Sequence, residues 1–203
     1  DIGIKERTLV FMLRHKEKSE EQFKHLIEEA KKQVEPIEII EKVKTKGNCA
    51  VVNIYDIHLD KRDVKNPNAG NEGTKTLVKE LEEGFADLLS SVLINQPDTF
   101  ILPVGNDLFT TNGFLQATKK GTPQDPSVTH EVIFKEGLSL VRNFIDILSN
   151  FGTVYVPIIY GNHSADAEFY LGVCLETLYW NNENVIINNS KRARKYIQYE
   201  GNL

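Results

Sequence analysis

Three short segments of the chain carry side chains that could bind metal ions. They are Asp56-Ile57-His58, Gly105-Asn106-Asp107 and Gly161-Asn162-His163. Together they offer carboxylate, imidazole and amide donors, which suit Mn, Fe or Zn rather than metals that prefer thiolate ligands. Each segment alone is a weak indication, because Asp, Asn and His beside glycine are also common in turns. Their meaning depends on whether the fold brings them together.

Each segment directly follows an apolar run typical of a β-strand, and helical patterns separate these runs. The predicted strands are residues 50–55, 99–104, 154–159 and 185–187, and the predicted helices are residues 74–93, 130–150 and 169–180. Strands that alternate with helices predict βαβ units and a parallel sheet, normally covered by helices on both faces. Because ligands collect at the carboxyl ends of such strands, we expect the three segments to converge there.

Two local expectations follow from strand geometry. Side chains alternate along an extended segment, so Asp56 and His58 are expected to point to the same side. Pro103 and Pro157 lie within predicted strands and indicate edge strands or irregular positions in the ladder, because proline has no N–H to donate.

The first part of the chain is predicted to be separate from the main domain. We expect residues 1–46 to be an N-terminal extension or the remnant of a preceding module, with a strand at residues 7–13 and a helix at residues 19–30. Residues 47–203 would form the main domain. The chain begins with Asp1 rather than Met and stops where a predicted strand runs into a turn, so we expect a fragment of a longer protein.

In their order and placement, the three segments resemble the calcineurin-like metallophosphoesterase family. The family pattern runs Asp-x-His, Gly-Asp, Gly-Asn-His followed by an acid, a lone His, and Gly-His-x-His. The resemblance covers about residues 49–190. It implies an α/β fold, a layered sandwich with a mostly parallel sheet flanked by helices, truncated here at the C-terminus. It also implies hydrolysis of phosphoesters by two divalent metal ions, Mn, Fe or Zn.

The resemblance assigns a role to each matching residue. Asp56 and His58 would bind the first metal, Asp107 would bridge both metals, and Asn162 would bind the second. His163 would contact the scissile phosphate or protonate the leaving group. Ser164 stands where the family has an acid that orients this histidine, and Asp166 is the candidate to replace it as a catalytic residue.

Two departures from the family pattern affect the predicted activity. Asn106 separates Gly105 from Asp107, and no histidine follows His163, so the last two family blocks are absent. Truncation is the favoured explanation, and a degenerate, metal-free homologue is the alternative. The basic run at residues 191–195 and the range of the family favour a phosphodiesterase or nuclease over a phosphomonoesterase. The alternative is a non-catalytic binding or scaffold module, and the isolated fragment is expected to be inactive.

Composition limits the partners. The net charge of -5 argues against broad nucleic-acid binding through a large basic face, although nucleic acid stays one candidate among phosphoester substrates. The basic run at residues 191–195 could contact phosphates or could simply be solvated. The long loop through residues 119–125 could border the site or be a surface excursion. Cys49 and Cys174 are expected to be reduced thiols.

The sequence contains no signal peptide and no long apolar run. We therefore expect a cytoplasmic setting without a membrane partner. The sequence does not predict the oligomeric state.

Overall fold

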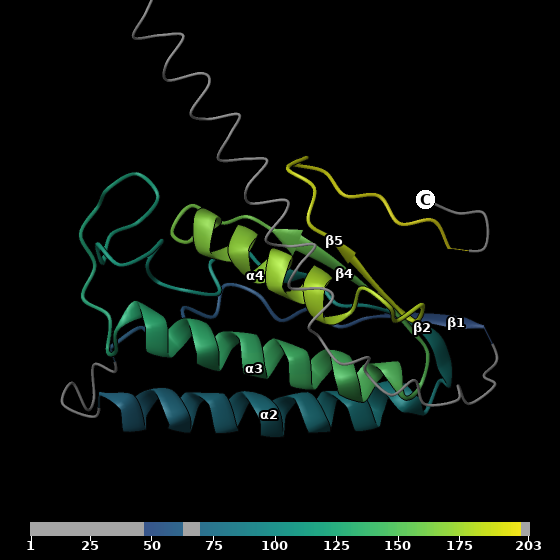
Figure 1. Ribbon diagram of the computed structural model, residues 1–203. Coiled ribbons are helices and arrows are strands. Elements are labelled where there is room, and N and C mark those ends of the chain that lie inside the picture. The colour runs from purple at the N-terminus through teal and green to yellow at the C-terminus, as the bar shows by residue number, and fades with distance from the viewer. Residues whose placement is uncertain (1–46, 63–69, 200–203) are drawn as a thin grey trace, which may run out of the picture.

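All strands of the sheet run parallel to one another, as predicted (Figure 1). The computed structural model describes residues 47–62 and 70–199. The strands are β1 (Asn48–Val51), β2 (Pro97–Ile101), β3 (Val104–Gly105), β4 (Thr153–Ile159) and β5 (Val185–Asn188), and the helices are α2 (Asn71–Leu93), α3 (His130–Ser149) and α4 (Ala165–Leu178). The predicted extension over residues 1–46 lies outside the described residues and stays a prediction.

Strands β2 and β3 pair with the same edge of β4, one after the other. Thr99 lies opposite Thr153, and Val104 lies opposite Ile158 in the same register. The pairing is interrupted at Pro103, which confirms the predicted irregular ladder position. The central strand β4 is therefore bordered by β2 and β3 on one side and by β5 on the other.

Pro157 lies inside this central strand, so the expectation that a proline would mark an edge is wrong there. The carbonyl of Tyr155 accepts from Leu102, and that of Ile159 accepts from Asn106, so alternate residues of β4 bond toward β2 and β3. The backbone of Pro157 also points toward β2 and β3. Its nitrogen, which has no hydrogen to donate, lies opposite the break between those two strands. The sheet thus places both prolines where the ladder is already interrupted.

The three helices lie side by side on one face of the sheet (Figure 1). Helix α2 packs on α3 through the stacked rings of Phe85 and Phe144, whose centroids are 4.1 Å apart. Val154 and Val156 of β4 are fully buried beneath the helices. None of the described helices combines the length and the apolar content that a bilayer crossing requires.

The opposite face of the sheet carries no helix among the described residues, in contrast to the expected cover on both faces. Val51 and Ile186 are 56% and 39% exposed. Part of this face borders a pocket of about 390 Å³, lined by Tyr155 and Pro157 of β4 and by Tyr196 of the segment that follows β5. Burial on the helix side and exposure on the other give the sheet a clear inner and outer face.

Two predicted boundaries shift for local reasons. The first strand ends at Val51, although Asp56 and His58 continue to donate backbone hydrogen bonds to the loop after β3. Helix α4 begins at Ala165, several residues before the predicted start, with Asp166 and Glu168 in its first turn. Acidic residues in a first turn are stabilised by the helix dipole. Because these residues are not apolar, the apolar periodicity did not predict the first turn of α4.

Candidate metal centre

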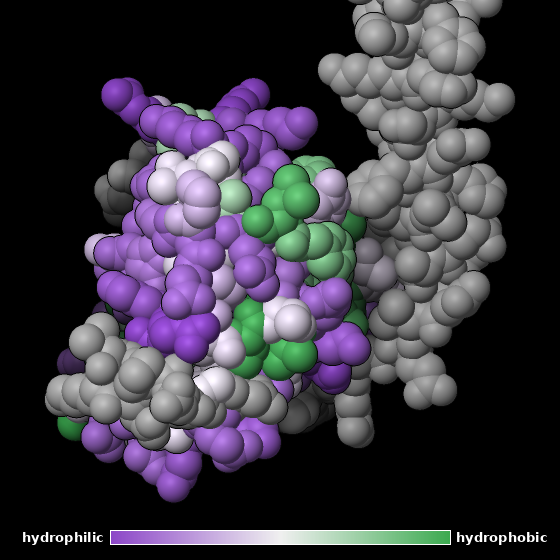
Figure 2. All heavy atoms as spheres, turned by 90° about the vertical axis from the view of Figure 1, so that its left-hand side faces the viewer, coloured by the Kyte–Doolittle hydropathy of each residue, from purple (hydrophilic) through white to green (hydrophobic). Residues whose placement is uncertain are grey.

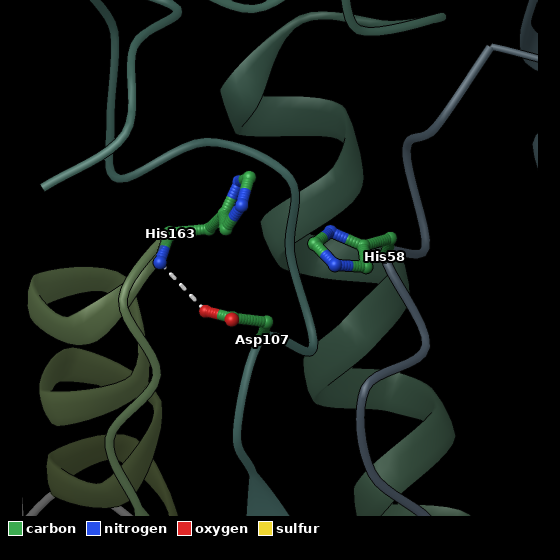
Figure 3. Close-up of side chains that lie close together, drawn as sticks. All are labelled: His58, Asp107 and His163. Carbon is green, nitrogen blue, oxygen red and sulfur yellow. Dashed lines mark hydrogen bonds between the residues drawn. The ribbon is translucent and has the colours of Figure 1, made fainter. Parts of the chain in front are cut away.

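Three of the predicted site residues lie together at the carboxyl edge of the sheet (Figure 3). One ligand atom from each of His58, Asp107 and His163 lies within 4.8 Å of the other two. The two imidazole rings meet edge to face, with centroids 4.8 Å apart and an angle of 84° between their planes. The residues come from the loops after β1, β3 and β4, so the predicted convergence of these loops is present in the fold.

His58 has one nitrogen engaged and one free of hydrogen bonds. Its Nε2 lies 3.3 Å from Oδ1 of Asp56, whose side chain is 63% exposed. Its Nδ1 is buried and has no hydrogen-bond partner among the described residues. A carboxylate near one nitrogen favours the proton there and leaves the other nitrogen with a lone pair, as in many metal-binding histidines. The buried orphan nitrogen fits a metal ligand.

His163 has the same pattern with a different partner. Its Nδ1 lies 3.1 Å from the carbonyl oxygen of Thr110. Because a carbonyl can only accept, Nδ1 carries the proton and Nε2 keeps a lone pair. The backbone N–H of His163 donates to Oδ1 of Asp107 at 2.7 Å. This bond ties the loop after β4 to the carboxylate.

The backbone of these loops is left-handed at several non-glycine residues. Asp56, His58, Asn106 and Asp107 have φ angles of 59°, 50°, 48° and 68°. Asp56 and His58 do meet on one side, since His58 Nε2 lies 3.3 Å from Oδ1 of Asp56. The expected reason is wrong, because neither residue is extended. Asp, Asn and His tolerate this region better than other residues, and such conformations concentrate at functional sites.

Two glycines permit the close approach of the loops. A Cβ on Gly105, which has a φ of 108°, would lie 2.2 Å from the carbonyl oxygen of Ile159. A Cβ on Gly161 would lie 1.9 Å from Oδ1 of Asp107. Both distances are below any real contact, so the glycines of the second and third segments are required for the loops to pack this closely.

A buried carboxylate that sequence reasoning missed joins the same loops. Glu168 is 0% exposed and accepts hydrogen bonds from the N–H groups of Asp107, Leu108 and Gly161 and from the hydroxyl of Ser164. Burial raises the pKa of Glu168, and these four donors oppose the rise. The sequence does hold a clue: Glu168 lies in register with Leu171 and Leu175 on the inward stripe of α4.

Asp60 is a second buried carboxylate that the sequence did not single out. It is 0% exposed, and its Oδ1 accepts from the N–H of Thr110 at 2.6 Å. Thr110 in turn presents its carbonyl to His163. Asp60 therefore fixes the residue that sets the tautomer of that histidine.

Asp166 lies beside the cluster with its own partners. Asn112 donates to its Oδ2 at 2.7 Å, and Lys119 donates to its Oδ1. Burial alone would raise the pKa of Asp166, but the hydrogen bonds from Lys119 and Asn112 outweigh it and hold the pKa below its ordinary value. The hydrogen-bond partner of His163 Nδ1 is the carbonyl oxygen of Thr110 and not the carboxylate of Asp166. No contact between Asp166 and His163 therefore supports the predicted orienting role of Asp166.

The long loop between β3 and α3 borders the site. The backbone N–H of Lys119 donates to the carbonyl of His163 at 2.9 Å. Figure 2, viewed toward the carboxyl edge of the sheet, shows a mostly hydrophilic face with small apolar patches. The loop exposes Phe114 and Leu115 by 74% and 93%. Of the two alternatives for this loop, proximity to the site is confirmed.

The remaining predicted ligands lie at the margin of the cluster. Asn162 is exposed, and its role as a ligand stays a prediction. Asp56 contacts His58 and is not one of the three clustered donors. Within the basic run, Lys191 lies over the ring of Phe169, 5.6 Å from its centroid, and its charge acts on Asp166. The run therefore begins close to the site.

Comparison of the chain with protein-family models, with curated proteins and with solved structures found no match in any of the three.

Proposed function

We propose that this chain supplies ligands to a divalent-metal site that hydrolyses phosphoesters, with diesters preferred to monoesters. One observation carries the proposal: His58 and His163 each have one nitrogen beside an oxygen acceptor and the other left for a ligand, next to Asp107. Histidines held this way are typical of metal sites, because the outer acceptor sets the tautomer and ring orientation. The unpartnered Nδ1 of His58 supports the same conclusion.

Each residue has a distinct role in this proposal. Asp107 and the two histidines hold the ion, and Asp56 orients His58 from outside. A bound divalent ion would polarise the phosphoester and acidify a water molecule. Three donors suit one ion, whereas the second ion of the proposed two-metal mechanism would require Asn162 and further ligands. Mixed imidazole and carboxylate donors favour Mn, Fe or Zn.

The charges around the site suggest an anionic substrate. Lys119 reaches the rim through its ion pair with Asp166, and Lys191 opens the basic run beside α4. Cations near a hydrolytic site attract phosphates. This placement supports an anionic phosphoester substrate, with nucleic acid as one candidate. A cytoplasmic setting stays a prediction.

The test uses the intact protein with added Mn²⁺ and bis-p-nitrophenyl phosphate. We expect metal-dependent release of nitrophenol and its loss in Asp107→Asn. Asp87→Asn, an exposed residue of α2, is the matched control and should behave as wild type. Absence of hydrolysis, together with Mn²⁺ binding that is equal in both variants, would contradict the proposal. A protein that binds no metal at all would favour the scaffold alternative.

A further inference from the structure

We infer that Glu168 is a positioning residue for the metal site: its buried carboxylate sets the distance between the loop of Asp107 and the loop of His163. The inference deepens the proposed function and rests on it. Glu168 lies outside the three segments from which the sequence predicts metal ligands.

The carboxylate contacts both loops directly. Oε1 accepts from the N–H of Asp107 at 2.7 Å and from that of Leu108 at 3.1 Å, whereas Oε2 accepts from the N–H of Gly161 at 2.6 Å. The hydroxyl of Ser164 completes the set, 3.0 Å from Oε1. One side chain thus bridges a loop after β3 and a loop after β4.

No β-ladder performs this task at the site itself. The pairing of β3 with β4 ends at Gly105 and Ile159, and one further bond follows, from Asn106 N–H to the carbonyl of Ile159. Beyond that point, His163 contacts the loop after β3 through Asp107, Thr110 and Lys119. Glu168 adds a carboxylate that accepts backbone N–H groups from both loops at once. Hydrogen bonds to an ionised acceptor are about twice as strong as neutral ones. Glu168 is therefore well suited to hold the left-handed loop of Asp107 in place.

Glu168 is a positioning residue rather than a ligand. Its side chain is 0% exposed, and both of its oxygens already accept hydrogen bonds from the protein. It does not belong to the clustered group of His58, Asp107 and His163. Gly105 leaves room for it, since a Cβ there would lie 3.3 Å from Cδ of Glu168.

The experiment compares Glu168→Gln with Glu176→Gln, an exposed glutamate on the same helix. Gln has nearly the volume of Glu, but its NH₂ group replaces one of the two oxygens. That NH₂ group would face a backbone N–H that needs an acceptor, so one of the loops must move. The first readout needs no metal: the imidazole NMR signals of His58 and His163, which shift each other because their rings meet edge to face. The second readout is Mn²⁺ affinity by calorimetry, with the folded fraction checked by circular dichroism.

We expect Glu168→Gln to stay folded, to change the imidazole shifts and to bind Mn²⁺ about 10- to 100-fold more weakly, the usual effect of losing an outer-shell partner. Glu176→Gln should match wild type. Wild-type imidazole shifts and Mn²⁺ affinity in Glu168→Gln would overturn the inference. If that variant does not fold, Glu168→Asp decides: it keeps both oxygens on a shorter arm, so altered imidazole shifts support the inference and unchanged ones overturn it. If wild type binds no Mn²⁺, the proposed function fails, and the metal-free readout still decides the role of Glu168.

Discussion

Gly161 lies so close to Asp107 that a Cβ on residue 161 would stand 1.9 Å from Oδ1 and 2.4 Å from the backbone nitrogen of Asp107. The glycine that precedes Asn162 and His163 therefore serves the packing of one loop against another. Any side chain at this position must displace the carboxylate that His163 N–H contacts.

Gly161→Ala should accordingly impair both folding and metal binding, because the added methyl group would meet the backbone nitrogen of Asp107 as well as its carboxylate. The added methyl group pushes Asp107 away from the two histidines, so we expect Mn²⁺ affinity to fall by at least about 10-fold. Calorimetric titration of the intact protein measures this. Gly113→Ala is the control, because a Cβ on Gly113 meets no atom within 4 Å. Equal affinities in the two variants would show that the close contact is not needed for binding.

Asp56 offers a test between two roles. If it only orients His58, Asp56→Asn keeps an oxygen acceptor near Nε2 and should weaken Mn²⁺ binding by about 10- to 100-fold. If it is a ligand, as the family resemblance implies, the same change should abolish Mn²⁺ binding, as we also expect of Asp107→Asn. We expect the first result because Asp56 is 63% exposed and contacts His58 at 3.3 Å. Titrating both variants in parallel decides the matter.

Two helix glycines should respond to alanine with opposite signs. Gly84 of α2 is exposed with open space around its Cβ position, so Gly84→Ala should stabilise the protein by about 0.5–1 kcal/mol. A Cβ on Gly137 of α3 would lie 2.6 Å from the ring of Phe109, which is fully buried. Gly137→Ala should therefore cost about 1–3 kcal/mol through overpacking. Urea unfolding of both variants measures the difference, and equal shifts would contradict the packing around Phe109.

Tyr179 should make the protein less stable in alkali. Burial raises its pKa above the ordinary value, and the hydrogen bond that its hydroxyl donates to Asp146 at 2.5 Å adds to the rise. Between the unfolded pKa of about 10 and the higher folded pKa, only the folded chain keeps this proton. The stabilisation is therefore complete below about pH 10 and declines as the pH rises further, by up to about 1.4 kcal/mol per pH unit.

The comparison for this prediction is between Tyr179→Phe and Tyr170→Phe, a half-exposed tyrosine on α4. Unfolding free energies measured at about pH 8 and about pH 11 should differ less for Tyr179→Phe than for wild type, because the titrating group is gone. Tyr170→Phe should keep the wild-type dependence. An unchanged dependence in Tyr179→Phe would mean that this hydroxyl does not keep its proton in the folded state.

Much of the architecture was readable from the sequence because it depends on local periodicity. The runs at residues 99–104 and 154–159 predicted strands, and the apolar spacing at residues 130–150 predicted α3 almost to its ends. Parallel pairing followed from the alternation of strands and helices. The same alternation predicts that His58, Asp107 and His163 lie at one edge of the sheet.

The tertiary structure alone decided how these residues meet. The left-handed backbone at Asp56 and His58 arises from contacts with a loop about 50 residues away, which no local pattern encodes. The described helices α2, α3 and α4 all lie on one side of the sheet, and helical cover of the other face stays a prediction.

The same division holds at the centre of the site. The sequence by itself determined which donor types are available and which strand ends carry them, because residue type and periodicity are local properties. Only the fold could show that Glu168 joins two loops and that Thr110 sets the tautomer of His163. Those roles depend on hydrogen bonds between segments more than 50 residues apart in the chain, with distances of 2.7–3.1 Å. Such contacts are set by how the loops pack together, which is a property of the whole structure rather than of any one segment.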